Sequence, residues 1–151
     1  MRPFRRILFP TDFSDYAEDA WPYATRFAKD FAAELHLLHV VSPSPSLVYT
    51  EGMPYDPKDM EETRVADARA ALDRLVGTAK DLGIIVQPLV CTGVPFHEIL
   101  EYARSRDIDL IVMATHGRTG LAHALLGSVT EKIVRSAPCP VLTVRHPAMK
   151  T

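Results

Sequence analysis

The sequence has 151 residues, of which 47% are hydrophobic, 24% charged and 8% aromatic. This length fits one ordinary domain spanning residues 1–151, and the composition excludes a disordered, collagen-like or coiled-coil chain. Seventeen Lys and Arg against nineteen Asp and Glu give a net charge of −2, so no overall field attracts nucleic acid or an anionic membrane, and we expect neither as a partner.

The first residues predict a strand, a helix and a second strand. Arg6–Pro10 is too short for a helix and is apolar on both faces, as in a strand covered from both sides. Ser14 or Asp15 is the predicted cap of a helix whose apolar positions repeat at helical spacing as far as Phe31. Glu34–Val41 is the second predicted strand.

The segment from about Ser42 to Lys58 interrupts this alternation. It carries four prolines and is too long for a plain connection, so we expect a flexible flap over a site or a loop that faces a partner. An amphipathic helix follows, from about Asp59 to Leu82.

The remaining chain alternates between strands and helices. The predicted strands are Ile84–Cys91, Asp109–Ala114 and Pro140–Arg145, and the predicted helices are Pro95–Ser105 and about Gly127–Ser136. Pro88 places the first of these strands at an edge or a bulge.

Five strands alternating with four helices predict a doubly wound, Rossmann-like α/β domain with a mostly parallel sheet and helices on both faces. Such sheets bind ligands beyond the carboxyl ends of the strands, where the strand order reverses. The residues after the first, second and fourth predicted strands are therefore the candidates for a site.

Glycines and hydroxyls cluster after the fourth strand. Gly117 and Gly127-Ser128, the latter opening a helix, predict a phosphate cradle of backbone N–H groups, and Ser128 and Thr130 add hydroxyl donors. The alternative is that the glycines make turns and Ser128 caps the helix. His116 and Arg118 flank Gly117 and are either phosphate ligands or solvated loop residues.

Asp12 follows the first strand, where a carboxylate suits the paired hydroxyls of a ribose. The alternatives are a helix cap or a charge next to the first helix. Val40 and Val41 end the second strand, where backbone groups suit an adenine edge and apolar side chains suit a core.

Several known site patterns are missing. The sequence lacks the phosphate loop with its lysine, the dinucleotide-binding glycine motif, the zinc-protease helix motif and the serine-hydrolase elbow. Asp12 is the one acidic residue that the predicted topology places in the cleft, so neither a metal pair nor an acid and base pair is predicted.

Cys91 and Cys139 are too few for a disulfide framework. This low cysteine content indicates a reducing, cytoplasmic setting. The chain also shows no signal peptide and no long apolar span.

These residues resemble the single-domain form of the universal stress protein family over nearly the whole chain. The family signature G-x2-G-x9-G-[ST] is matched from Ala114 to Ser128, with Ala114 in place of the first glycine. The other matching segments are Ile7–Ser14, His39–Val41 and Ala137–Leu142.

The resemblance implies ATP, or else ADP or AMP, in the cleft, with Mg²⁺ held by the phosphates. It assigns Asp12 to ribose and adenine, the Val41 backbone to adenine, and Gly117, Gly127 and Ser128 to the phosphates. The full set of implied binding residues is Pro10, Thr11, Asp12, Val40, Val41, Met113, Thr115, His116, Gly117, Arg118, Gly127, Ser128, Val129 and Thr130.

The function expected from this resemblance is a nucleotide-dependent regulatory dimer of the stress response, with at most slow hydrolysis and an unidentified protein partner. The alternatives are a nucleotide-free dimeric interaction module, or an enzyme of adenylyl or phosphoryl transfer. Pro140–Arg145 is an apolar terminal strand with an uncovered edge, and both this edge and the family resemblance predict a homodimer paired through it.

Overall fold

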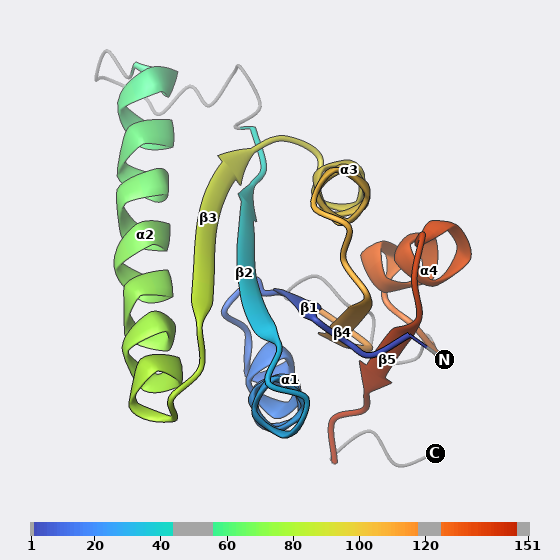
Figure 1. Ribbon diagram of the computed structural model, residues 1–151. Coiled ribbons are helices and arrows are strands. Elements are labelled where there is room, and N and C mark those ends of the chain that lie inside the picture. The colour runs from blue at the N-terminus through green and yellow to red at the C-terminus, as the bar shows by residue number, and fades with distance from the viewer. Residues whose placement is uncertain (1, 44–55, 118–124, 148–151) are drawn as a thin grey trace.

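The computed structural model describes residues 2–43, 56–117 and 125–147 (Figure 1). The elements in chain order are β1 (Arg6–Pro10), α1 (Asp15–Asp30), β2 (Glu34–Val41), α2 (Pro57–Asp81), β3 (Val86–Thr92), α3 (Pro95–Ser105), β4 (Leu110–Ala114), α4 (Ser128–Ser136) and β5 (Val141–Val144).

The five strands form one sheet in the order β3-β2-β1-β4-β5, and every neighbouring pair is parallel. The predicted doubly wound α/β fold is confirmed. Because the chain moves outward from β1 to β3 on one side and from β4 to β5 on the other, the strand order reverses between β1 and β4. A crevice is expected beyond the carboxyl ends of these two strands.

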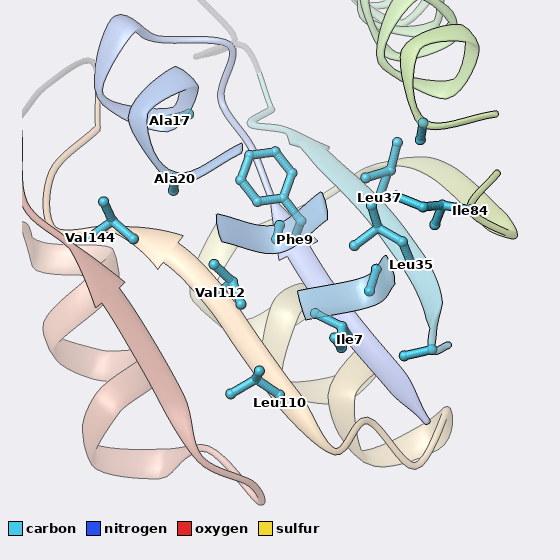
Figure 2. Close-up of a cluster of buried hydrophobic side chains, with 14 of the residues drawn as sticks. Ile7, Phe9, Ala17, Ala20, Leu35, Leu37, Ile84, Leu110, Val112 and Val144 are labelled. Atoms are coloured by element: carbon cyan, nitrogen blue, oxygen red, sulfur yellow. The ribbon is translucent and has the colours of Figure 1, made fainter. Parts of the chain in front are cut away.

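Helices cover both faces of the sheet (Figure 1). Successive side chains of β1 point to opposite faces, so that Ile7 and Phe9 pack with α1 and α2 whereas Leu8 packs with α3 and α4. Figure 2 shows Ile7 and Phe9 on the first face, beside Leu35 and Leu37 of β2. Burial on both faces explains why the strands are continuous apolar runs in the sequence.

Side-chain caps fix where the first two helices begin. The Ser14 hydroxyl accepts a hydrogen bond from the Ala17 amide and caps α1. Asp56 caps α2 through the Lys58 amide, and Pro57 occupies the first turn, where a missing N–H costs nothing. The helix therefore begins before the predicted Asp59, and residues 57–58 of the predicted flexible loop are helical. Residues 44–55 of that loop lie outside the described part of the chain.

The two edge strands are β3 and β5. Pro88 lies in β3, which confirms its predicted edge position, although the strand runs from Val86 to Thr92 rather than from Ile84 to Cys91. β5 is shorter than predicted by one residue at each end. Across the described residues, no helix is both long and apolar enough to cross a membrane.

Candidate functional site

A cleft of about 850 Å³ lies at the carboxyl ends of β1, β2 and β4. Twelve of the fourteen residues predicted to bind a ligand line it: Pro10, Thr11, Asp12, Val40, Val41, Met113, His116, Gly117, Gly127, Ser128, Val129 and Thr130. Thr115 is buried and does not line the cleft. Arg118 lies outside the described residues. Segments far apart in the sequence thus meet where the topology predicts.

Gly127, at the start of α4, packs against the segment that follows β4. It caps the helix in an extended conformation that any residue adopts, with φ −65° and ψ 159°. Its amide donates to the Thr115 carbonyl at 2.7 Å. A Cβ at position 127 would lie 3.3 Å from both the His116 Cα and the Thr115 oxygen. Glycine suits this position because two backbone segments approach closely, not because of its φ angle.

Asp12 and Gly117 also pack closely. The Asp12 Oδ1 accepts a hydrogen bond from the Ser14 amide at 3.0 Å, and a Cβ at Gly117 would lie 2.5 Å from Oδ2. Since Ser14 caps α1, the alternative role of Asp12 as that helix cap is wrong. The carboxylate is half-buried at the wall of the cleft, against the loop after β4.

The first turn of α4 faces the cleft without a side-chain cap, because its N-cap is Gly127. Ser128 is the first helical residue and is exposed, so the alternative that it caps the helix is wrong. Uncapped N–H groups at a helix start favour an anion. Thr130 has a different role: its hydroxyl donates to the Ala114 carbonyl at 2.9 Å and ties α4 to β4. This hydroxyl proton is not free for a phosphate.

The backbone of β2 points alternately to its two neighbours. Glu34 and Leu38 bond toward β1, through Arg5 and Thr11, whereas Val41 accepts from the Gly93 amide on the β3 side. By this alternation the amide and carbonyl of Val40 face the β1 side, two residues past Leu38, where β1 has ended. The prediction that the Val41 backbone faces a ligand is therefore corrected to Val40.

Histidines support the walls of the cleft. The buried His116 ring places Nδ1 3.0 Å from the Thr115 hydroxyl and lies beside Tyr16. His39 places Nδ1 2.7 Å from the Thr11 carbonyl and stacks on Phe13. The Thr115 amide donates to Val144 of β5, which anchors this loop to the sheet.

Helix α2 forms a further wall of the cleft that was not predicted from the sequence. Arg64, Asp67, Ala68, Ala71 and Arg74 of α2 also line the cleft. Their spacing places them on one helix face, a pattern visible in the sequence, but only the tertiary structure shows which face meets the cleft. The Arg64 guanidinium donates to the Ser42 carbonyl at 2.8 Å, holding the end of β2 against α2.

The sequence pattern of one family matches residues 3–145, and that family is described as the Universal stress protein family. The chain belongs to the universal stress protein family. Universal stress protein MJ0531 of Methanocaldococcus jannaschii is 37% identical over 146 residues, covering 95% of this chain and 84% of that protein. Universal stress protein YxiE of Bacillus subtilis is 34% identical over 150 residues, covering 94% and 99%.

Solved structures of universal stress proteins share this fold. UspA from Lactobacillus plantarum superposes with a TM-score of 0.84 at 28% identity, covering 96% of this chain and all of that one (100%). A universal stress protein in complex with cAMP has a TM-score of 0.72 at 23% identity, covering 95% and 98%. An Arabidopsis thaliana member with AMP bound has a TM-score of 0.65 at 20% identity, covering 95% and 93%.

Proposed function

We propose that this universal stress protein binds ATP in the cleft and acts as a nucleotide-dependent regulatory dimer. The observation that carries the proposal is the close packing of the uncapped α4 start against the loop after β4, with the Asp12 carboxylate packed against Gly117 of the same loop. This places a group that favours phosphate and a group that favours ribose hydroxyls in one cleft. The two solved members that hold adenine nucleotides support it.

The adenine is assigned to the end of β2. The Val40 amide and carbonyl, which face the side where β1 has ended, offer one donor and one acceptor to the edge of the base. Pro10 and Met113 supply apolar surface on the neighbouring strands. This arrangement combines a largely apolar wall with a few polar groups, as in most small-molecule sites.

The phosphates are assigned to Gly127, Ser128 and Val129. The amides of Ser128 and Val129 belong to the first turn of α4, and the Ser128 hydroxyl adds a donor. Mg²⁺ is assigned to the phosphates themselves. Across the described residues, no group of three or more His, Cys, Asp or Glu side chains is placed to hold a metal ion.

Ala114 replaces the first glycine of the family signature. It is buried in the same core cluster as Val112 and Val144, and its carbonyl accepts the Thr130 hydroxyl. Because the methyl packs within this cluster, we expect the substitution to leave nucleotide binding intact.

The proposal is tested by identifying the ligand that the protein carries. The purified protein is denatured and the released small molecules are analysed by mass spectrometry, and calorimetric titrations with ATP, ADP and AMP are made with and without Mg²⁺. We expect an adenine nucleotide in the extract and saturable binding of ATP. No nucleotide and no heat of binding would overturn the proposal in favour of a nucleotide-free interaction module. Turnover of ATP faster than about one per second would instead indicate an enzyme.

A further inference from the structure

A second pocket, of about 420 Å³, lies at the opposite end of the sheet, where the parallel strands begin and α3 ends. Glu34 and His36 of β2 line it together with Tyr102 and Arg106 at the end of α3. None of its described lining residues lines the cleft. It is therefore separate from the proposed nucleotide site.

The pocket is lined by a hydrogen-bonded pair, a buried histidine and a half-buried tyrosine. The His36 Nδ1 lies 2.8 Å from the Tyr102 hydroxyl, and the histidine is only 4% exposed. Burial lowers the pKa of His36 and raises the pKa of Tyr102, so both groups are neutral near pH 7. The buried His36 Nε2 faces the Glu34 Oε2 across 3.4 Å, and no other group of the described residues bonds to it.

Opposite charges stand at the two ends of this neutral pair. The Glu34 Oε2 lies 3.4 Å from the His36 Nε2, and a neutral imidazole does not compensate its charge. The Arg106 guanidinium lies over the Tyr102 ring at 5.7 Å, and within the described residues it forms no ion pair. Arg6, by contrast, contacts Asp107 and the Arg106 carbonyl. One carboxylate that faces a neutral imidazole and one cation with no ion pair among the described residues thus share the same pocket.

We propose that this pocket binds a small free zwitterion of amino-acid size, with its ammonium on Glu34 and its carboxylate on Arg106. An anion without a positive group would be repelled by the Glu34 carboxylate. A cation without a negative group would be repelled by the Arg106 guanidinium. The two arginines and two carboxylates of the lining cancel in charge, so a ligand carrying both signs fits better than either single charge. The Tyr102 hydroxyl and the His36 ring supply polar atoms between the two ends.

The test uses the full-length protein and defined probes. Glycine, γ-aminobutyrate and glycylglycine are titrated and followed by calorimetry and by the NMR signals of the His36 and Tyr102 rings. Propionate and butylamine carry one charge each and serve as controls. We expect at least one zwitterion to saturate at millimolar concentration or below and to shift both ring signals, and each single-charge probe to bind at least tenfold more weakly.

Substitutions test whether Glu34 binds the ammonium of the ligand and Arg106 its carboxylate. Glu34→Gln and Arg106→Gln should each weaken the zwitterion roughly tenfold or more, because each removes a charged hydrogen-bond partner. Glu101→Gln and Arg104→Gln are matched controls, because both are exposed on α3 and neither lines the pocket. Arg106 is exposed, so its variant should fold even where the Glu34 variant does not.

Three results would overturn the proposal. The first is that none of the zwitterions binds at millimolar concentration, and the second is that propionate or butylamine binds as tightly as the zwitterions. The third is that binding is unchanged in Arg106→Gln.

Discussion

Asp12 combines an observed turn contact with a position in the proposed nucleotide site. Its Oδ1 accepts from the Ser14 amide, while Oδ2 packs where a side chain at position 117 would stand. Asparagine keeps an oxygen for the Ser14 amide but removes the negative charge. The two roles of the residue are therefore separable by a single substitution.

We expect Asp12→Asn to weaken ATP binding by about 1.5–3 kcal/mol, the value of a hydrogen bond to a charged group, and to change the stability of the nucleotide-free protein little. Calorimetric titration and urea unfolding measure the two effects. Asp15→Asn, at an exposed position in the first turn of α1, is the control and should bind ATP normally. Unchanged affinity in Asp12→Asn would remove Asp12 from the site.

The buried His36 ring should make the free energy of unfolding depend on pH. Burial lowers its pKa below the ordinary 6.5, so the unfolded chain binds this proton more readily than the folded protein does. The free energy of unfolding should therefore rise as pH increases from below the folded pKa to about 6.5 and level off above it. Urea unfolding between pH 5 and 8 measures this slope.

His36→Gln should reduce that slope, because it removes the titrating group. His97→Gln, on the exposed side of α3, is the control. A profile for His36→Gln that coincides with the parent profile would show that His36 does not carry the effect.

At the scale of elements, the approach of α4 to the loop after β4 depends on Gly127. An alanine Cβ would meet backbone atoms of Thr115 and His116 at 3.3 Å, so one of the two segments must move. We expect Gly127→Ala to cost about 1–3 kcal/mol of stability, as in other overpacked sites, and to weaken ATP binding because the amides of α4 are displaced. Thermal unfolding and calorimetry check both effects.

Gly77 provides the matched control in α2. A Cβ there meets nothing within 4 Å. Gly77→Ala should raise stability by about 0.5–1 kcal/mol through helix propensity and leave ATP binding unchanged. Normal ATP affinity in Gly127→Ala would place the phosphates away from α4.

At the scale of the whole molecule, the proposed dimer contact is the outer edge of β5, which pairs with no second strand among the described residues. The Pro140 carbonyl accepts from the Ile111 amide of β4, and the Val144 carbonyl accepts from the Thr115 amide just after β4, so by alternation the backbone groups of Val141 and Thr143 face the outer edge. An antiparallel pair of β5 strands would use these groups. Such an edge is otherwise a site for unwanted pairing.

Thr143→Pro should separate the dimer without breaking the β4-β5 ladder, because it removes only an N–H that faces the edge. Sedimentation should then give the 16.8 kDa monomer, whereas Thr143→Val should remain a dimer. A parent protein that sediments as a monomer at micromolar concentration would contradict the proposal.

Much of the architecture follows from the sequence alone. Apolar runs such as Arg6–Pro10 and Glu34–Val41 gave the bounds of β1 and β2, since burial on both faces leaves a strong local signal. Local capping chemistry placed the start of α1 at Ser14 or Asp15. The alternation of elements predicted the parallel sheet, and the reversal of strand order placed the cleft.

The details of the site depended on contacts between distant segments, which no local pattern records. Only the hydrogen bond from Gly93 shows that the Val41 carbonyl is occupied and that Val40 faces the cleft. Only the packing of α4 on residues 115–117 explains Gly127, and only the placement of α2 brings Arg64 and Arg74 to the cleft. The sequence determined which elements form, because the formation of helices and strands depends on local periodicity and burial. The tertiary structure decided which backbone groups remain available for a ligand, because segments far along the chain form hydrogen bonds with some of these groups and not with others.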